Sequence, residues 1–410
     1  MLDPYIIRKD FPIFAKGEER PLVYLDNAAT TQRPRVVIES IKEFYENSNA
    51  NVHRGHYPLS EKADRLYEEA HEVVAKHVGA ESWEEISFFY NTTHAISSIA
   101  IPIVEWGIKR GRRRILVTEM DHHSNMLPWR RAADLLKAKI DYVKVSREGY
   151  LDLKDLESKL DEDLIAIALP HASNVTGIVN PVEEIVRKAK KYGALVVLDA
   201  AQSIPHMEIN VKNLGVDFLA FSGHKMLGPF GIGALYGKKE ILEELNPVFT
   251  GGGTIKDVTL ENVLYARPPY KLEAGTPNVA GAVGLKAAVE YIENVGKENI
   301  AAHEKILVSE LRKRLTEIEW VDVYPKKLES SFVGTVAFNV KGQNPHVVGK
   351  VLGDFYHIAV RTGLHCAHPY HYAMGAEEGT VRASFYIYNT VEEVDYLTTS
   401  LIDARKKYLG

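Results

Sequence analysis

The chain has 410 residues, of which 45% are hydrophobic and 26% charged, and its formal net charge is -5. This composition is typical of a folded globular protein, and the charge gives no electrostatic basis for binding nucleic acid. No apolar run approaches the about 20 residues that span a bilayer, and the N-terminus lacks the apolar core of a signal peptide. With one cysteine and no export signal, we expect a cytoplasmic protein without a nucleic acid or a membrane as partner.

From about residue 65 to about residue 240, short apolar runs alternate with longer helical patterns. This alternation is typical of a parallel sheet built from βαβ units, and runs that are apolar throughout predict strands covered on both faces. The expected strands are 86–90, 115–118, 165–169, 195–198, 218–221 and 232–236. Helices are expected between them, for example over 60–78 and 181–192.

The Gly- and Pro-marked stretch 251–269 is expected to lead into a second domain. A long helical pattern over 280–315, strand-like runs at 334–339 and 358–360, and a closing helix from Val391 follow it. This mixture predicts a smaller α+β domain, which the first residues of the chain join. We place the large domain at residues 20–265 and the smaller one at 1–19 and 266–410.

Polar residues follow five of the expected strands. In a parallel sheet these strand ends lie along one edge, where ligands bind in open α/β folds. The five segments are 91–94, 119–125, 170–174, 199–202 and 222–225. We therefore predict a site at this edge of the sheet.

The residue types in these segments suggest what the site holds. Thr92 and Thr93 offer hydroxyls and backbone N–H groups to an anion such as phosphate, although either could simply cap its helix. Asp199 ends an apolar strand and needs a cation, either a protonated ring nitrogen or a structural salt-bridge partner. Lys225, among apolar neighbours, could form a Schiff base or be structural. Together these groups describe a pyridoxal 5'-phosphate site.

The single cysteine, Cys366, lies in the run Arg361-Thr-Gly-Leu-His-Cys-Ala-His-Pro369. A buried core cysteine is the ordinary alternative, but the flanking arginine and histidines can lower a thiol's pKa and favour a reactive thiolate. His365, Cys366, His368 and His371 could also converge on zinc, although Pro369 breaks helical spacing and no second Cys/His cluster is present. The glycines of 228–233 lead into a strand instead of opening a helix, so they do not indicate a dinucleotide loop.

Several segments match a known family across essentially the whole chain. They are Tyr24-Leu-Asp-Asn-Ala-Ala29, Asn51-Val-His-Arg-Gly55, Met120-Asp-His-His-Ser-Asn125, Ser173-Asn-Val-Thr-Gly177, Asp199-Ala-Ala-Gln202, Ser222-Gly-His-Lys225, Glu273-Ala-Gly-Thr-Pro-Asn278, Arg361-Thr-Gly-Leu-His-Cys-Ala367 and Val381-Arg-Ala-Ser384. With them the chain resembles the cysteine desulfurases of the class V aminotransferase fold, in particular the SUF-type (group II) members. The resemblance implies a fold type I pyridoxal-phosphate transferase, with a mostly parallel seven-stranded sheet in the large domain and a smaller α+β domain.

The resemblance also assigns residues. Lys225 would carry the cofactor as a Schiff base and move the substrate α-proton, Asp199 would pair with the ring nitrogen, and His122 would stack on the ring. Gln202 and Asn174 would bind the ring hydroxyl. The phosphate would be held by Thr93, Ser222 and His224, with Thr276 reaching across from a second subunit of a homodimer. Arg382 would fix the substrate carboxylate, and Arg361 would share that task or tune the thiol. Asn174 would also contact the substrate.

The reaction implied is the conversion of L-cysteine to L-alanine through a persulfide on Cys366, with the sulfur passed to a thiol or a scaffold protein for iron–sulfur cluster assembly. Leu364 stands where this family often has a histidine, which removes one proton donor beside the thiol. The alternatives are a selenocysteine lyase acting on L-selenocysteine, an aminotransferase or an epimerase of the same fold. A more distant alternative is a non-catalytic metal or redox module built on the His365–His371 cluster.

Overall fold

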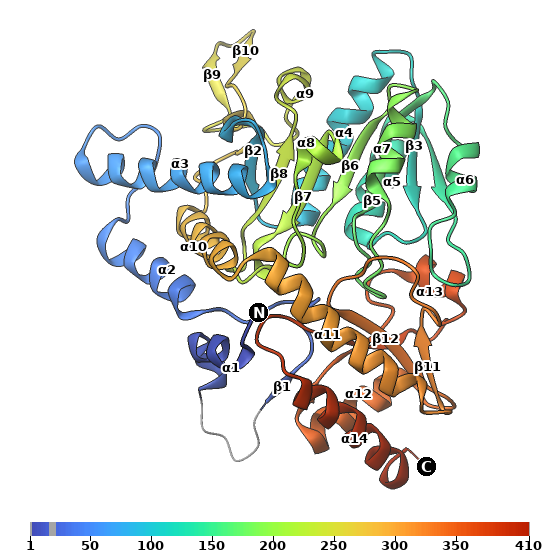
Figure 1. The fold of residues 1–410 in the computed structure, drawn as a ribbon. Helices are drawn as coiled ribbons and strands as arrows, with labels where there is room; N and C mark the ends of the chain where they lie inside the picture. Colours follow the sequence, from blue (N-terminus) through green and yellow to red (C-terminus); the bar gives the residue numbers. More distant parts are fainter. Residues whose placement is uncertain (1, 16–21, 410) are drawn as a thin grey trace.

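A computed structural model describes residues 2–15 and 22–409 of the chain. A seven-stranded sheet with helices on both faces forms one part of the molecule, and a smaller four-stranded sheet backed by helices forms the other (Figure 1). The α/β class expected from the sequence is confirmed. The domain division stays a prediction, and its first boundary, between residues 19 and 20, lies outside the described residues.

The large sheet has the strand order β2-β8-β7-β6-β5-β3-β4. Its strands are β2 (Ile86–Phe89), β3 (Arg114–Thr118), β4 (Lys139–Val143), β5 (Leu164–Pro170), β6 (Leu195–Asp199), β7 (Phe218–Ser222) and β8 (Gly233–Gly237). All six expected strands are present, but β8 runs antiparallel to both of its neighbours, β2 and β7. Only a short turn region joins β7 to β8, and a parallel pair would need a longer crossover.

Helices cover both faces of this sheet. They include α2 (Arg35–Asn47), α3 (Pro58–Val78), α4 (Thr92–Ile108), α5 (His123–Leu136), α6 (Leu153–Ser158), α7 (Val182–Lys190), α8 (Val211–Leu214), α9 (Lys239–Glu244) and α10 (Val279–Val295), with the short turns η3 (Trp83–Glu85), η4 (Gly223–Lys225) and η5 (Tyr270–Leu272). Successive strand residues point to opposite faces. Ile115 and Val117 therefore pack with α4 and α5, whereas Leu116 packs in the core that contains α3, α7 and α10.

The smaller sheet is antiparallel, with the order β11-β12-β15-β14. Its strands are β11 (Val321–Tyr324), β12 (Thr335–Val340), β14 (Arg361–Gly363) and β15 (Thr380–Ser384). Three helices share a core with one face of it: α11 (Lys297–Thr316), α12 (Pro345–Tyr356) and α14 (Val391–Lys407). On β15, Val381 and Ala383 enter this core, so Thr380 and Arg382 lie on the opposite face.

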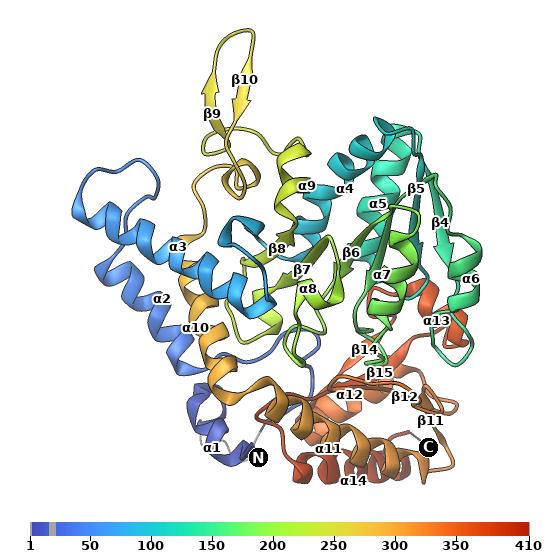
Figure 2. The ribbon, with the colours of Figure 1, turned by 45° about the horizontal axis from the view of Figure 1, so that its top comes forward.

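The helix expected over 280–315 is two helices. Gly296, with φ 85°, separates α10 from α11, and this left-handed backbone favours glycine. α10 packs on α2 and α3 beside the large sheet, whereas α11 contributes to the core of the small one. The break therefore lets one nearly continuous helical segment join the two parts of the molecule (Figure 2).

Two further segments complete the fold. The stretch 251–269 contains a hairpin of β9 (Ile255–Val258) and β10 (Val263–Tyr265) that protrudes from the molecule (Figure 2). The expected run 358–360 forms β13 (Ile358–Ala359), which pairs with β1 (Val23–Tyr24). Near the N-terminus, α1 (Pro4–Ile7), η1 (Arg8–Asp10) and η2 (Pro12–Phe14) lead into this region, and Phe11 packs on Tyr388. Of the helices in the described ranges, none has the length and hydropathy to cross a membrane.

Candidate active site

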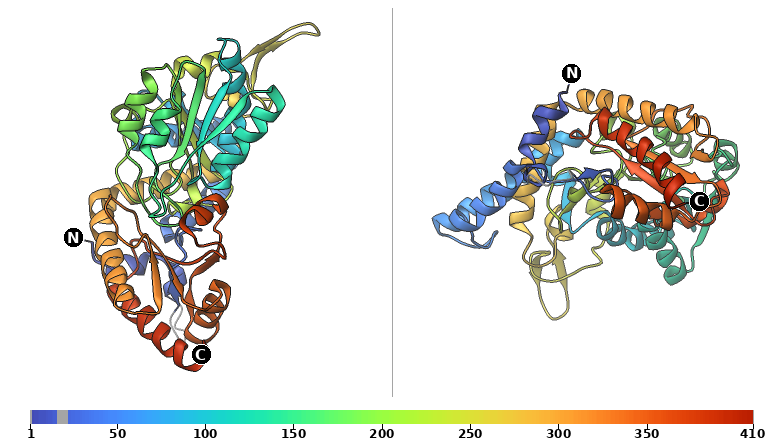
Figure 3. Two further views of the ribbon diagram at one scale, coloured as in Figure 1. Left: turned by 90° about the vertical axis from the view of Figure 1, so that its right-hand side faces the viewer. Right: turned by 90° about the horizontal axis from the view of Figure 1, so that it is seen from below.

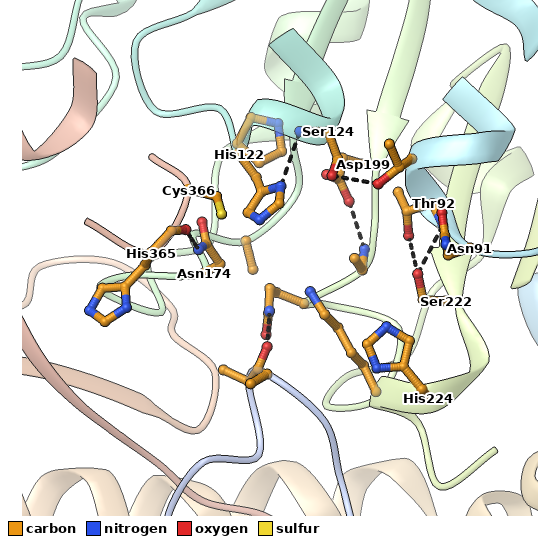
Figure 4. Close-up of a pocket in the computed structure, with 18 of the residues that line it drawn as sticks. Asn91, Thr92, His122, Ser124, Asn174, Asp199, Ser222, His224, His365 and Cys366 are labelled. Carbon is orange, nitrogen blue, oxygen red and sulfur yellow. Dashed lines mark hydrogen bonds between the residues drawn. The ribbon is translucent and has the colours of Figure 1, made fainter. Parts of the chain in front are cut away.

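A cavity of about 510 Å³ lies at the edge of the large sheet where the sequence placed a site (Figure 4). All five polar strand ends contribute to its wall, together with the loop that follows β14. Its lining includes the predicted residues Thr93, His122, Asn174, Asp199, Gln202, Ser222, His224, Lys225, Arg361, Cys366 and Arg382. Thr276 is the one predicted site residue outside it, and it lines a separate cavity of about 250 Å³.

Lys225 and Asp199 occupy the buried floor of the cavity. Lys225 ends the η4 turn after β7, and burial lowers the pKa of its ammonium to about 8, against the opposing influence of Asp199. Asp199 ends β6 and accepts a 2.9 Å hydrogen bond from the Ala201 backbone N–H, and burial raises the pKa of its carboxyl. A lysine with this pKa has an appreciable neutral fraction near neutral pH, which is the form that reacts with an aldehyde.

The N-terminus of α4 faces the cavity with several hydroxyl groups, which pair with one another. Asn91 caps this helix by accepting from the His94 N–H at 3.0 Å, so neither threonine is the cap. Thr92 donates its backbone N–H to Ser222 Oγ at 2.9 Å, and Thr93 Oγ1 lies 2.6 Å from Ser124 Oγ. A helix N-terminus ringed by hydroxyls is suited to an anion.

His122 and His224 are both neutral imidazoles. Burial and the nearby Lys225 lower the pKa of His122 to about 3, and its Nδ1 accepts from the Ser124 N–H at 3.1 Å, which places its proton on Nε2. Burial lowers the pKa of His224 to about 4. His224 also stacks on Phe230, with ring centroids 5.5 Å apart.

Two arginines mark the other end of the cavity. Arg382 on β15 is buried and donates to the Asn174 carbonyl at 2.8 Å, and burial lowers the pKa of its guanidinium to about 10. Arg361 donates through Nε and Nη2 to Asp26, at 3.1 and 2.8 Å, and Asp26 also lies 3.4 Å from Arg382. Asp26 was not among the predicted site residues. The signal was an acidic residue directly after the apolar run Val23-Tyr24-Leu25.

Cys366 lies on the loop between β14 and α13 (His368–Met374), and it is exposed, so the interpretation as a core cysteine is wrong. Two of the histidines near it in the sequence, His365 and His371, supply no positive charge to the thiol. Burial lowers the pKa of His365 far below its usual range and that of His371 to about 4, so both rings are neutral. The rings also have other partners: His365 and His371 contact Thr380, and His368 stacks on His123 with centroids 4.6 Å apart.

Four buried polar atoms of the residues that line the cavity have no hydrogen-bond partner within the described ranges: Gln202 Oε1, His224 Nδ1, His365 Nδ1 and Arg382 Nε. Native proteins rarely leave such atoms unpaired, so their number here indicates a missing polar ligand. An anion site, a carboxylate deep in the cavity and a lysine of lowered pKa fit the phosphate, the ring nitrogen and the aldehyde of pyridoxal phosphate. Fold and site together thus define a pyridoxal-phosphate enzyme.

Comparison with known proteins narrows this class. Residues 23–397 match the family model "Aminotransferase class-V". A probable cysteine desulfurase of Aeropyrum pernix is 45% identical over 405 residues, which cover 97% of each chain. The apo structure of the cysteine desulfurase from Thermococcus onnurineus NA1 superposes with a TM-score of 0.91 at 42% identity, and the cysteine desulfurase CsdA of Escherichia coli in its S-sulfonic acid form with 0.88 at 32%. Both matches cover 99% of each chain.

The chain therefore belongs to the class V aminotransferase family, and within it to the cysteine desulfurases. Its cofactor is pyridoxal 5'-phosphate. The narrower assignment to the SUF-type group stays a prediction.

Proposed function

We propose that this enzyme converts L-cysteine to L-alanine, takes the sulfur onto Cys366 as a persulfide, and passes it to an acceptor for iron–sulfur cluster assembly. The observation that carries the proposal is the position of the chain's single thiol. Cys366 is exposed on a loop at the mouth of the cavity that also contains Lys225, Asp199 and Arg382. An enzyme that only transferred amino groups would have no use for a thiol at this position.

Different residues of the cavity wall would bind different parts of the cofactor. Asp199 would face the ring nitrogen, His122 the ring and Gln202 the ring hydroxyl, with Asn174 beside it. Thr93, Ser222 and His224 would hold the phosphate at the N-terminus of α4. When bound, the cofactor acts as an electron sink for the carbon that carries the substrate amino group.

Lys225 has two tasks in this scheme. Its Nζ would bind the cofactor aldehyde and, once the substrate has replaced it there, would take the proton from the substrate Cα. Both tasks need a neutral amine, which the burial that lowers its pKa to about 8 favours. His122 stays uncharged because burial lowers its pKa to about 3, and its Nε2 carries the proton of the neutral ring.

The two arginines would bind the substrate carboxylate. A guanidinium matches a carboxylate with two parallel hydrogen bonds, and burial strengthens such pairs. Arg382 is held in place by the Asn174 carbonyl and Arg361 by Asp26. With the carboxylate fixed between them, the substrate side chain can extend toward the loop that carries Cys366.

The sulfur transfer balances without an external oxidant. The Cys366 thiolate attacks the substrate sulfur, a sulfur–sulfur bond forms, and the bond between that sulfur and the substrate Cβ breaks. Its electron pair stays with the carbon, which gains a proton and leaves as part of alanine. An acceptor thiol then takes the outer sulfur and returns Cys366 to its starting state.

A second copy of the chain would complete the site. Thr276 lies outside the main cavity, in one lined by Tyr67, Phe88 and His94, and the exposed side chains Tyr90, Phe230 and Phe249 leave an apolar surface nearby. A partner covering this surface would bring its own Thr276 toward the phosphate. Sedimentation should then give twice the 46.0 kDa mass of one chain.

Anaerobic turnover of L-cysteine with a thiol reductant tests the function. The wild-type protein should release alanine and sulfide in equal amounts, and Cys366→Ala should release neither while keeping the visible absorbance of the bound cofactor. Lys225→Ala should lose that absorbance. Full sulfur release by Cys366→Ala would show that the nucleophile is wrong, and alanine from L-selenocysteine but not from L-cysteine would indicate a lyase.

A further inference from the structure

The backbone at the catalytic thiol has an unfavourable conformation. His365 has φ 45° and Cys366 φ 54°, so two consecutive residues with side chains adopt the left-handed region. Each such residue costs about 1–2 kcal/mol, and the conformation persists only where the surroundings enforce it. The contacts of this loop should therefore show what keeps the thiol in place.

Backbone groups account for part of the restraint. The Cys366 carbonyl accepts the His123 N–H at 2.8 Å, the His365 carbonyl accepts from the Asn174 side chain at 2.8 Å, and Ala367 donates its N–H to Leu364 at 2.8 Å. The first two bonds attach the loop to segments that follow strands of the large sheet, and the third is a turn within the loop. They leave open what holds it to the smaller sheet, on which the substrate-binding Arg382 lies.

Thr380 makes that second attachment, through its carbonyl and its hydroxyl. His365 Nε2 lies 3.1 Å from the Thr380 carbonyl and 3.0 Å from its Oγ1. A carbonyl only accepts, so Nε2 carries the proton of the neutral ring. His371 Nδ1 lies 2.9 Å from the Ala367 carbonyl, which by the same reasoning fixes its proton on Nδ1 and leaves Nε2 to accept from Thr380 Oγ1 at 3.3 Å.

These proton positions give one consistent chain of hydrogen bonds. His365 donates to the Thr380 hydroxyl, the hydroxyl donates to His371, and His371 donates to the Ala367 carbonyl. The chain starts and ends on the two residues that flank Cys366. It requires His371 to be neutral, because its Nε2 accepts, and burial lowers the pKa of this ring to about 4.

Thr380 also stands in a fixed relation to the substrate-binding arginine. Thr380 and Arg382 are two residues apart on β15, so their side chains lie on the same face of the strand, about 7 Å apart along it. One strand thus sets the position of both the carboxylate anchor and the loop that carries the nucleophile. A shift of about 1 Å between reacting groups can cost about 100-fold in rate.

We propose that the Thr380 hydroxyl is a positioning group, which through His365 and His371 holds the Cys366 thiol in register with the substrate fixed by Arg382. The inference rests on the proposed desulfurase function. It assigns a task to three residues that make no direct contact with the reacting atoms in the scheme above. It also gives the neutral rings of His365 and His371 a role beside the thiol.

The first test compares Thr380→Val, which removes only the hydroxyl, with the matched control Thr380→Ser, which keeps it. In the valine variant kcat for alanine release from L-cysteine should fall by about 10- to 100-fold, because the loop is loosened. KM should change by less than about twofold, because Arg382 and the strand pairing are untouched. The serine variant should restore kcat.

The second test needs no turnover. Hydrogen exchange of the full-length protein without substrate, followed in peptides over 364–371, should be about 10-fold faster in Thr380→Val than in the wild type and unchanged in Thr380→Ser. His371→Gln, which loses the bond to the Ala367 carbonyl, should loosen the same peptides and stands in if the valine variant does not fold.

Wild-type exchange in the valine variant, a KM that rises as much as kcat falls, or a serine variant as slow as valine would each overturn the proposal. If the wild-type protein itself releases no alanine from L-cysteine, the proposed function fails, and the exchange comparison alone decides whether Thr380 holds the loop.

Discussion

Asp26 positions the two arginines that we propose bind the substrate carboxylate. It accepts two bonds from Arg361 and lies within ion-pair distance of Arg382, while the Asn174 carbonyl holds Arg382 independently. A free arginine side chain loses up to about 2 kcal/mol of rotamer entropy when it is fixed. Asp26 fixes Arg361 before the substrate arrives, so the substrate carboxylate does not have to order it.

Asp26→Asn should therefore weaken substrate binding more than it slows the reaction. We expect KM for L-cysteine to rise about 10-fold, and kcat to fall by less than about threefold, because the charge-assisted bonds to Arg361 are lost while Arg382 keeps its own partner. Steady-state kinetics measures both. Asp354→Asn, which removes an exposed carboxylate paired with Lys350 on α12, is the control and should leave both constants unchanged. A lower KM in the Asp26 variant would mean that Asp26 competes with the substrate.

At the scale of elements, a buried carboxylate connects the loop of Thr276 to the large sheet. Glu273 accepts from the Phe88 N–H on β2 at 2.6 Å and from the Tyr67 hydroxyl on α3 at 2.7 Å, and it lies 2.9 Å from His71 Nε2. Burial alone would raise the pKa of Glu273, but His71 and these donors outweigh it and hold the pKa below its usual value. The carboxylate is therefore ionised, and both of its oxygens have hydrogen-bond partners.

Glu273→Gln should destabilise the fold, because the amide group brings its own protons toward donors that need an acceptor. We expect the free energy of unfolding to fall by about 2–4 kcal/mol, as for other buried groups that lose a charged partner. Urea unfolding measures it. Glu310→Gln, which breaks a half-buried i,i+4 helix pair with Arg314, should change it by less than about 0.5 kcal/mol. Equal effects of the two variants would contradict the role given to Glu273.

The sequence predicts the central elements well because they are buried throughout. All residues of β5, β6 and β7 are buried, so their uniformly apolar runs are clear. β4 was missed because it is an edge strand whose pattern, Lys-Ile-Asp-Tyr-Val, is mostly exposed or half-buried. The hairpin of β9 and β10 was missed for the same reason, because exposed residues carry no periodic signal.

Some residues of the site could be predicted from the sequence and others could not. Lys225, Asp199 and the polar strand ends could be found because each interrupts an apolar run at a fixed place in the sheet. Asp26 followed an apolar run, but its pairing with Arg361 and Arg382 spans more than 300 residues of chain. The role of Thr380 arises from the final geometry of its side chain with His365 and His371. The charge state of His365 also needed the structure, since it depends on burial.

At the scale of the whole molecule, the two parts lie side by side (Figure 3), and residues of both line the cavity. The large sheet supplies the groups suited to the cofactor, and the smaller part supplies Cys366, Arg361 and Arg382. Many titratable side chains in this region are buried in their neutral form. The stability of the fold should accordingly depend on pH in a way that individual residues control.

His171 offers a clean test, because burial lowers its pKa from the ordinary 6.5 to about 4. Between these values the unfolded chain binds a proton that the folded protein does not, so stability falls as the pH falls. This one residue should remove about 3 kcal/mol between pH 7 and pH 4. Burial raises the pKa of Asp121 to about 7, so this group makes stability rise as the pH falls and opposes the effect of His171. The prediction is therefore the difference in pH dependence between the wild type and a His171 variant.

Urea unfolding of the wild type and of His171→Gln at pH 7 and pH 4 measures that difference. The glutamine variant should lose about 3 kcal/mol less than the wild type over this range, because it has no group to titrate. Parallel losses in the two proteins would show that His171 is not held neutral by burial.

The persulfide on Cys366 is the central claim, and the mass of the intact protein tests it most directly. After brief anaerobic incubation with L-cysteine and no reductant, the chain should be heavier by one sulfur atom, a dithiol should remove the addition, and peptide mapping should place it on the single cysteine. Alanine formed with no addition to Cys366 would contradict the account, because the sulfur would then leave the substrate by a route that does not use this thiol.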